Sequence, residues 1–460
     1  MMKVSGKHLA LIFVIGCTIY AAFAANRLAI HSQDNHFVYL ADAFLKGQTG
    51  LVRRPHHGND WASYQVVELK GDSARQYGVE VRGYFTRRKG KADQFRTLDD
   101  QLIDIPKKDR GKQTTKHFVS FPPGPAVLLM PFVAAVGYGA NDVVFTVAMA
   151  GLNLVFMWLL LLRVRSQGYI ERTDRELAWF LVLFGFGTAV FWCSVLGQVW
   201  FTALIVGLTF HTLYLYFAFD CRRPFWAGVF LACAFASRAS LVFAALFFYW
   251  QLFVGQQDRF DSRQKMRAFV LFTAPCLVVG VSLLIYNYVR FENAVEFGHT
   301  YLAGGHIPRI RDFGLFHPHF VNRNLAAAFT LTPRFSSAYP YVQLSKHGMS
   351  LFLTTPVFVY LFFARAPGWL KWGLWMPVLI ISIPLLMYQN TGWEQFGYRF
   401  ILDVLPYLIL ILVTSKLAVT KRFKTLILVG VIVNAIGAAT FQRGYAGKLY
   451  GHFMTEEPKK

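Results

Sequence analysis

Five charged residues, spread over most of the chain, are of the types that move protons and hold phosphate. They are Asp34, Arg238, Arg290, Glu394 and Arg399. An arginine side chain can donate two parallel hydrogen bonds to a phosphate group, and it keeps its charge at physiological pH. A carboxylate beside them could take a proton from an incoming hydroxyl group. Together, these residue types suit a reaction at an anionic lipid headgroup, provided that the fold brings them to one face of a membrane.

Asp34 stands at the start of a predicted helix that follows the first apolar segment. Apolar residues recur there at positions i, i+3, i+4, i+7 and i+8, and they are Phe37, Leu40, Ala41, Phe44 and Leu45. This spacing predicts an amphipathic helix that lies along the membrane surface and ends near Gly47. Asp is a favoured residue at helix N-caps, so Asp34 is a cap, a general base held at the membrane edge, or both.

The other charged residues stand near the ends of apolar segments. Ser237-Arg238 falls where two segments meet, and Arg290 follows the string Tyr-Asn-Tyr-Val at the end of another. Glu394 and Arg399 belong to a string that also carries Asp403. A charge at such a depth is costly, so it is functional or it is satisfied by an internal ion pair or by reaching the interface. Both interpretations stay open for each residue.

Composition indicates that membrane helices must position these residues. The 460 residues are 55% hydrophobic, 17% aromatic and only 16% charged, with 45 phenylalanines, and the apolar residues fall in long blocks. The net charge is +22, but the basic residues lie in short connections, where they face membrane lipids, so no nucleic-acid partner is predicted. The five cysteines have no paired spacing, which indicates neither a disulfide framework nor a zinc site.

Eleven apolar blocks are candidate membrane spans. They cover residues 9–30, 143–162, 177–197, 199–219, 225–237, 241–254, 268–289, 349–363, 372–388, 400–419 and 426–440. A further block, 121–138, opens with Phe-Pro-Pro-Gly-Pro. Its prolines make a rigid turn, or they free backbone carbonyls at an interface or cavity wall.

The block 121–138 decides the predicted topology. If it does not cross the membrane, every short inner connection is basic, as the positive-inside rule requires. The basic residues concerned are Arg163, Arg165, Arg172, Arg175, Arg222, Arg223, Arg259, Arg263, Lys265, Arg267, Arg365, Lys371, Lys421, Arg422 and Lys424. We therefore predict about eleven spans, with an inner N-terminus and an outer C-terminus. The first span, preceded by Lys3 and Lys7, is predicted to be retained and not to be a cleaved signal peptide. A bacterial cytoplasmic membrane is preferred, although an endoplasmic reticulum protein would follow the same orientation logic.

The predicted fold is therefore an all-α polytopic membrane protein whose non-membrane mass lies on the outer face. The predicted parts are a first transmembrane helix (1–30), an extracytoplasmic loop with amphipathic juxtamembrane helices (31–142), transmembrane helices (143–289), a second extracytoplasmic loop (290–347), C-terminal transmembrane helices (348–442) and an extracytoplasmic tail (443–460). The first loop is basic, and it could hold an acidic glycan or lipid acceptor or simply be a solvated or headgroup-binding surface. Its basic residues include Arg53, Arg54, Arg87, Arg88, Lys107 and Lys108.

At these residues the sequence resembles the GT-C superfamily of integral-membrane glycosyltransferases, in particular the polyprenyl-phosphate-sugar-dependent group of protein mannosyltransferases and lipid A aminoarabinose transferases. The similar features run from residue 34 to residue 406. They are Asp34 and Tyr39 with Ala41, Ala43, Leu45 and Gly47 after the first span, the Pro-Pro-Gly-Pro block, Ser-Arg238, the string Tyr-Asn-x-x-Arg-Phe-x-Asn-x-x-Glu-Phe-Gly, and the string Phe-Gly-Tyr-Arg-Phe-x-x-Asp-x-x-Pro.

The resemblance implies a GT-C-like fold and an inverting transfer of sugar from a polyprenyl-phosphate donor to a glycan, lipid or protein acceptor. It implies that Asp34 is the catalytic base and that Arg399 and Arg238 stabilise the leaving phosphate. Arg290, Glu394 and Tyr39 complete the predicted substrate- and phosphate-binding set. Many members carry a second acidic residue immediately after the first, but this sequence has Asn35 there and then His36, which is a polar contact or merely interfacial. No cofactor is predicted with certainty, and a divalent cation stays open.

Two other classes of protein stay open. A transporter or flippase of a lipid-linked substrate predicts charges in mid-span, broken helices in matching halves and similar loops on both faces. The spans are poor in charge and the loops are asymmetric, which favours the enzyme. Asn35 keeps open a structural subunit of an envelope-assembly complex with a decayed site. The sugar, the polyprenol and the acceptor are not fixed by the sequence.

Overall fold

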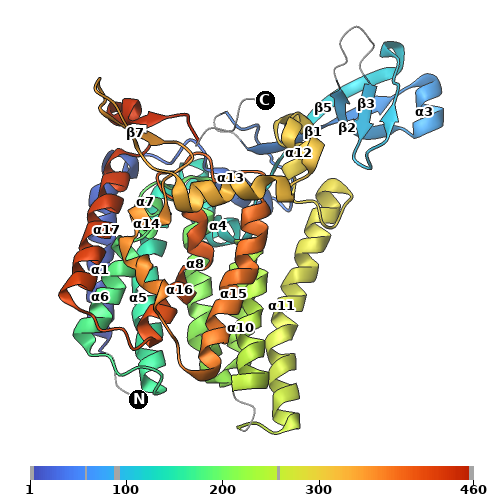
Figure 1. Cartoon of the computed structure of the whole chain (residues 1–460). Helices are drawn as coiled ribbons and strands as arrows, with labels where there is room; N and C mark the ends of the chain where they lie inside the picture. The colour runs from blue at the N-terminus through green and yellow to red at the C-terminus, as the bar shows by residue number, and fades with distance from the viewer. Residues whose placement is uncertain (1–4, 57–59, 87–93, 256–258, 455–460) are drawn as a thin grey trace. The chain divides into compact units, whose positions relative to one another are not determined.

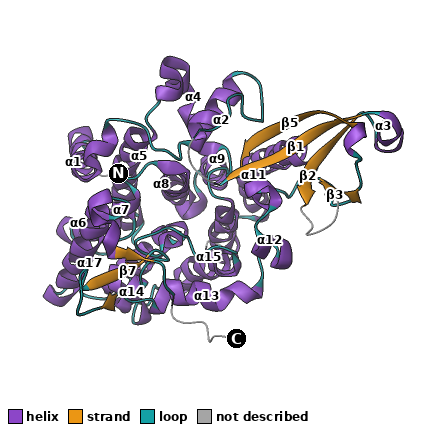
Figure 2. Ribbon diagram, turned by 90° about the horizontal axis from the view of Figure 1, so that it is seen from above, coloured by secondary structure: helices purple, strands orange, loops and turns teal. Residues whose placement is uncertain are grey.

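The computed structural model describes residues 5–56, 60–86, 94–255 and 259–454, and Figures 1 and 2 show their secondary structure. The chain divides into two compact units. We call residues 1–32, 141–279 and 316–460 the helical unit, and residues 33–140 and 280–315 the sheet unit. Arg87 and Arg88 of the predicted basic loop lie outside the described residues, as does Lys3.

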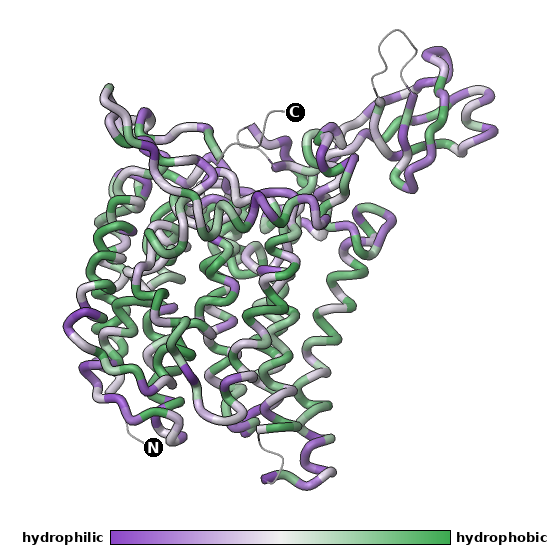
Figure 3. The backbone as a smooth tube through the Cα atoms, in the orientation of Figure 1, coloured by the Kyte–Doolittle hydropathy of each residue, from purple (hydrophilic) through white to green (hydrophobic). Residues whose placement is uncertain are grey.

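Among the described residues, six helices are long and apolar enough to cross a membrane, which indicates an integral membrane protein. They are α1 (Gly6–Ala24, continued by the 3₁₀ turn η1, Ala25–Leu28), α5 (Asp142–Ser166), α8 (Gln198–Ala218), α11 (Ser262–Phe291), α15 (Gly368–Met387) and α17 (Lys421–Thr440). Figure 3 shows hydrophobic residues along most of their length. Residues 280–291 of α11 belong to the sheet unit.

The other predicted spans are also helical, but they are short or interrupted, so the prediction of about eleven spans is not confirmed. The elements are α6 (Asp174–Phe186), α7 (Val190–Cys193), η4 (Phe219–Cys221), α9 (Pro224–Phe235), η5 (Ala239–Ala244), α10 (Ala245–Trp250), the π-helical η6 (Gln251–Gly255), α14 (Leu351–Thr354), η11 (Pro356–Phe362), η12 (Arg399–Asp403) and α16 (Leu405–Thr414). The helical unit also contains η9 (Pro318–Phe320), α13 (Val321–Leu325), the π-helical η10 (Ala326–Thr330), η13 (Gly444–Leu449) and the small sheet β6 (Arg334–Phe335), β7 (Val342–Ser345) and β8 (Tyr450–Gly451).

Glycines bring α1 and α5 close together in the helical unit. A Cβ atom at Gly16 would collide with the Leu154 side chain, and one at Gly151 would collide with Cys17. Small residues at such contacts let membrane helices approach closely. The resulting van der Waals packing stabilises their association, because no hydrophobic driving force acts between helices in lipid. The hydroxyl of Tyr20 on α1 adds a hydrogen bond of 2.9 Å to the carbonyl of Gly185 on α6.

Two arginines join the end of α1 to the residues that follow α17, and one of them caps α1. Arg443, just after α17, donates to the carbonyls of Phe23 and Ala24 at 2.7 and 2.9 Å. Arg27, just after α1, donates to the carbonyls of Phe441 and Gln442 at 2.6 and 3.0 Å. The last carbonyls of a helix have no partner within it, and a cation there also interacts favourably with the helix dipole. These contacts fix both ends together.

The sheet unit corrects the all-α prediction, because the first loop contains a five-stranded antiparallel sheet. Its order is β4-β3-β2-β1-β5. The strands are β1 (Trp61–Leu69), β2 (Glu80–Thr86), β3 (Gln94–Thr97), β4 (Leu102–Ile103) and β5 (Arg110–Val119), and the unit also contains α3 (Gly71–Tyr77), η2 (Lys107–Asp109), η7 (His299–Tyr301), η8 (Ala303–Gly305) and α12 (Pro308–Phe313). Alternation along β1 sends Tyr64 and Val66 to a core with Phe291, and Val67 to a second core with Phe95.

Two helices of the sheet unit lie where the sequence predicts juxtamembrane helices, and their position at a membrane stays a prediction. The first, α2 (His36–Leu45), buries Phe37, Leu40 and Ala41 of the predicted apolar face, but it also buries Val38 and Asp42 and leaves Leu45 exposed. The second, α4 (Gly124–Val136, followed by η3, Gly137–Gly139), begins within the proline-rich block. At 13 residues it is about 20 Å long, which is too short to cross a hydrocarbon core of about 30 Å.

Candidate active site in the sheet unit and the arginine cluster of the helical unit

Asp34 lies directly before α2, in a stretch of polar residues that the protein largely buries. The N-cap position is Asn35, whose side chain makes no capping hydrogen bond. Asp34 and Asn35 are only 8% and 4% exposed, and His36 is fully buried. The Asn35 Nδ2 amide group has no hydrogen-bond partner among the described residues. Burying a polar group without a partner costs free energy. A bound ligand that accepted a hydrogen bond from the Asn35 amide would offset this cost.

Aromatic rings surround the start of α2. The His36 imidazole stacks on the Trp61 indole with centroids 3.6 Å apart and planes 3° from parallel. Tyr39, one turn along α2, meets Trp61 edge to face at 5.5 Å and Tyr138 at 4.8 Å. Trp61 is the first residue of β1, so the sheet fixes the position of its ring against α2. Sites for small molecules are commonly lined in this way, by aromatic rings with a few convergent polar groups.

A second aspartate of α2 is held quite differently. Tyr138 donates a 2.6 Å hydrogen bond to Asp42 Oδ2, and Lys46 Nζ lies 2.9 Å from the same oxygen. Burial, followed by the Asp42 carboxylate beside it, raises the pKa of the Tyr138 hydroxyl, so this group remains the donor. These contacts tie α2 to η3 after α4, which gives Asp42 a structural position. Sequence reasoning assigned no role to Trp61, Tyr138 or Asp42.

Arg290, predicted to bind phosphate, is 2% exposed in the sheet unit. Its Nη1 donates to the Val119 carbonyl at 2.7 Å, and its Nη2 donates to the Asn287 amide oxygen at 2.7 Å. Its guanidinium lies 3.8 Å from the ring centroid of Tyr286 and 4.7 Å from that of Phe291. These contacts join the end of β5 to the end of α11, and phosphate binding by Arg290 stays a prediction.

In the helical unit, Arg238 forms a two-point ion pair with a buried carboxylate. Its Nε and Nη2 donate to the two oxygens of Asp403 at 3.0 and 2.7 Å, and Ser240 donates to the same carboxylate at 2.6 Å. Asp403 is 2% exposed, whereas 16% of the Arg238 side chain is reachable. The internal-pair interpretation of Arg238 is therefore realised, with a partner 165 positions along the chain.

Arg399 and Glu394 lie in the same unit, and Arg399 shares an aromatic neighbour with Arg238. The guanidinium carbons of Arg399 and Arg238 lie 5.6 and 5.5 Å from the ring centroid of Phe400. Arg399 is 4% exposed, and its Nη1 lies 3.3 Å from the Glu394 carbonyl oxygen. The Glu394 carboxylate points elsewhere, to Lys346 Nζ at 2.7 Å.

The structure thus groups the predicted residues within each unit. Asp34 and Tyr39 share the start of α2 in the sheet unit, and Arg290 joins β5 to α11 there. In the helical unit, the guanidinium carbons of Arg238 and Arg399 lie 5.5 and 5.6 Å from the Phe400 ring centroid. Within residues 5–56, 60–86, 94–255 and 259–454, no group of three or more His, Cys, Asp or Glu side chains is placed to hold a metal ion.

Comparisons with known proteins add little to this geometry. No family model matches the chain, and no curated protein matches it. Among solved structures, it is similar to the crystal structure of the oligosaccharyltransferase of Archaeoglobus fulgidus in the apo form, with a TM-score of 0.46 and 10% sequence identity. The match covers 95% of this chain and 56% of that one, so the chain spans little more than half of its length. A likeness at this level does not establish a shared fold.

Proposed function

We propose that this protein is a membrane-embedded inverting glycosyltransferase. It moves a sugar from a polyprenyl-phosphate donor to an acceptor hydroxyl group, and Asp34 is the general base. The observation that carries the proposal is the position of Asp34, an 8% exposed carboxylate two residues before His36. His36 begins α2 and stacks on Trp61, and Tyr39 meets the same ring edge to face. Aromatic rings with a nearby carboxylate suit a sugar ring and a hydroxyl nucleophile.

In the proposed reaction, Asp34 accepts the proton of the acceptor hydroxyl as its oxygen attacks C1 of the donor sugar. The new bond forms between that oxygen and C1, on the face opposite the bond from C1 to the phosphate oxygen, which breaks. The electron pair of the broken bond leaves with the polyprenyl phosphate. The configuration at C1 is inverted, and the proton is released from Asp34 to solvent after the step. A positioned base of this kind contributes a rate factor of about 10² to 10⁴.

The leaving phosphate gains negative charge during the step, and arginines suit its stabilisation. Arg399 and Arg238, which both lie by the Phe400 ring, carry that role in the proposal. Asp403 neutralises part of the Arg238 charge, so Arg399 takes the larger share. Arg290, Glu394 and Tyr39 remain proposed contacts to the substrate, with Tyr39 the best placed of them because its ring stands beside Trp61.

We place the activity on the outer face of a bacterial cytoplasmic membrane, in the assembly of an envelope glycan or glycolipid. The six apolar helices support an embedded enzyme. Lipid-linked sugars are amphiphilic and remain in the bilayer, so a transferase that uses them needs such an anchor. The acceptor is a glycan, a lipid or a protein on the same face.

The test is reconstitution of the full chain into liposomes that contain polyprenyl-phosphate donors with radiolabelled sugars and total membrane acceptors. The proposal expects label in the acceptor, with the C1 configuration opposite to that of the donor. Transfer with retained configuration would contradict the inverting mechanism. Movement of the donor between leaflets, without any transfer from any donor, would instead support a transporter or flippase.

A further inference from the structure

The sheet unit contains a second feature, at the place where β2 separates from β1. The two strands pair from Gln65 opposite Gly83 to Glu68 opposite Glu80. Towards its start, β1 takes a different neighbour, because Ala62 forms a bridge with Leu302. The last residues of β2 stay with β3, where Phe85 pairs with Phe95. The two strands therefore diverge, and the segment around residue 304 closes the space between them.

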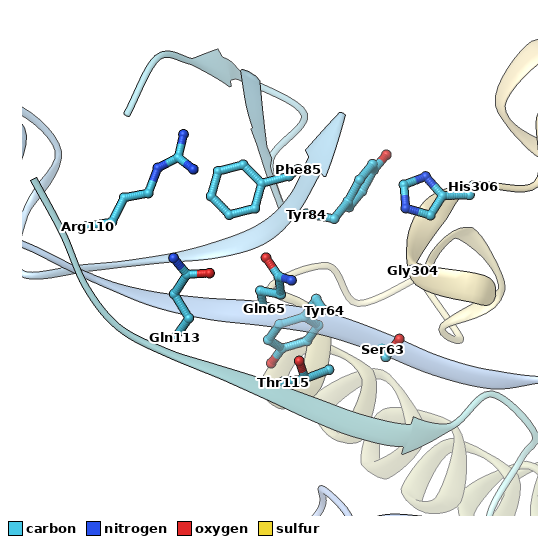
Figure 4. Close-up of a pocket in the computed structure, with 10 residues that line it drawn as sticks. All are labelled: Ser63, Tyr64, Gln65, Tyr84, Phe85, Arg110, Gln113, Thr115, Gly304 and His306. Carbon is cyan, nitrogen blue, oxygen red and sulfur yellow. The ribbon is translucent and has the colours of Figure 1, made fainter. Parts of the chain in front are cut away.

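A pocket of about 310 Å³ occupies this space, and we call it the strand pocket. It is lined by Ser63, Tyr64, Gln65, Tyr84, Phe85, Arg110, Gln113, Thr115, Gly304 and His306, all within the sheet unit. Figure 4 shows Arg110, Phe85, Tyr84 and His306 in a row along one side, with Gln113, Gln65 and Ser63 below them on the strands. Rings and a cation thus face amides and a hydroxyl across the pocket.

The side of the pocket that is formed by the aromatic rings and Arg110 is held in place by close contacts. Tyr84 meets His306 edge to face at 6.0 Å. A Cβ atom at residue 305 would lie 2.6 Å from the Tyr84 ring, so only glycine allows the closing segment to come this near. Arg110 lies over Phe85 at 4.4 Å, and its Nε and Nη2 donate to the Ile105 carbonyl at 2.9 and 2.8 Å. The guanidinium is fixed at one end of the row before any ligand arrives.

The polar side offers an acceptor that the protein does not use. The Gln65 amide oxygen is buried and has no hydrogen-bond partner among the described residues. Leaving such a group unpaired costs about 1–3 kcal/mol, and native proteins rarely do so. A hydroxyl or amide N–H from a ligand would remove that cost. Ser63, Gln113 and Thr115 supply further hydroxyl and amide groups around it.

The charge of the lining selects among ligands that carry hydroxyl groups. None of the ten lining residues is acidic, and Arg110 contributes a permanent positive charge. A guanidinium fixed beside hydroxyl and amide groups suits a carboxylate or a phosphate on a sugar. Flat aromatic faces with a few convergent polar groups suit the sugar ring itself.

We propose that the strand pocket binds an acidic oligosaccharide. The proposal also assigns this glycan as the acceptor, and that assignment rests on the proposed function. Trp61, Ser63 and Gln65 are alternate residues of β1 and share one side of the strand. Alternate residues lie about 7 Å apart, so the pocket at Gln65 lies about 14 Å along β1 from Trp61. Trp61 stacks on His36, two residues after Asp34. A short acidic glycan held in the pocket therefore extends along β1 towards the proposed base.

The test is direct binding to the full chain in lipid nanodiscs, which needs no donor. The probe is an array of acidic and neutral oligosaccharides of two to six sugars, with uronic acids, sialic acids and sugar phosphates among the acids. The strongest acidic ligand is then titrated by calorimetry beside its neutral analogue, in which the acidic group is reduced or removed. The proposal expects the wild type to bind the acidic form at least 10-fold more tightly.

Three variants locate the site. Arg110→Met should lose the preference for the acidic form, and Gln65→Leu should weaken both forms about 5-fold or more. Lys112→Met removes an exposed charge from β5, the strand of Arg110, outside the lining and should bind like the wild type. Unchanged thermal unfolding confirms that each variant folds, and Gln113→Leu, at an exposed position, replaces Gln65→Leu if that variant does not.

Failure of this inference can be told apart from failure of the proposed function. If no acidic oligosaccharide binds, or if Arg110→Met and Gln65→Leu bind like the wild type, the strand pocket is not the glycan site. If binding is as expected but no donor supports transfer, the pocket stands and the transferase proposal falls. If transfer occurs to acceptors that the pocket variants use equally well, the proposed function stands and the acceptor assignment falls.

Discussion

Arg238 and Arg290 show two ways of burying a guanidinium in one chain. In the helical unit, Asp403 neutralises Arg238 through two hydrogen bonds. In the sheet unit, Arg290 is held by the neutral oxygens of Val119 and Asn287 and lies over two aromatic rings. The first arrangement depends on a full opposite charge and the second on several dipoles and ring faces. They should therefore fail differently when one partner is removed.

The largest expected effect comes from breaking the Arg238–Asp403 pair. Asp403→Asn leaves a mostly buried guanidinium without its countercharge, and losses of about 3–5 kcal/mol are usual in such cases. The double variant Arg238→Met with Asp403→Leu removes both charges and should recover most of the loss. Chemical unfolding in detergent measures both. If the free energy of unfolding of Asp403→Asn lies within about 1 kcal/mol of the wild-type value, the Asp403 carboxylate does not stabilise the Arg238 guanidinium as described.

Arg290→Met should cost less, about 2–3 kcal/mol, because it takes a donor from the Val119 carbonyl and the Asn287 amide oxygen and leaves no charge unpaired. Adding Asn287→Leu should recover only part of the loss, since the Val119 carbonyl remains and the Ala294 carbonyl loses its 3.1 Å hydrogen bond from the Asn287 amide. Limited proteolysis of the sheet unit at increasing denaturant concentration measures the change in the free energy of unfolding. Full recovery in this double variant would show that Arg290 and Arg238 are held alike.

The Lys346–Glu394 pair gives the smallest expected effect. Both side chains are about one-third exposed, at 36% and 31%, so solvent screens their 2.7 Å contact. Glu394→Gln should change the free energy of unfolding by less than about 1 kcal/mol, and added salt should shrink the difference further. A loss as large as that of Asp403→Asn would mean that Glu394 belongs to a buried network instead of a surface pair.

The sequence alone predicts the helical unit better than the sheet unit. Every apolar block that it singles out forms helix, because apolar runs of that length have few alternatives. The break between α6 and α7 (Asp174–Phe186, Val190–Cys193) begins at Gly187, the C-cap of α6, and is invisible in hydropathy. The prediction misses the sheet because it assigns only helices to the first loop. The alternation of Trp61–Leu69, with its buried positions 62, 64 and 66, was the available signal.

Candidate residues follow the same pattern. The start of α2 can be predicted to within two residues, since its spacing is local, but the interpretation of Asp34 as its N-cap is wrong, because the N-cap is Asn35. The stack of Trp61 on His36 could not be predicted, because it joins a strand to a helix through a loop. The pairing of Arg238 with Asp403 spans 165 positions and has no local signature. Whether Asp34 is a base stays a prediction.

The most direct test of the central claim compares the two aspartates beside and within α2, Asp34 and Asp42, which are equally exposed at 8%. Asp34→Asn and Asp42→Asn each remove one charge, and the amide oxygen introduced by Asp42→Asn would still accept a hydrogen bond from the Tyr138 hydroxyl. Single-turnover transfer from a radiolabelled polyprenyl-phosphate sugar should fall about 100-fold or more in Asp34→Asn, the share expected of a general base, and stay within about 3-fold of wild type in Asp42→Asn. Equal transfer rates in the two folded variants would contradict the assignment of Asp34 as the base.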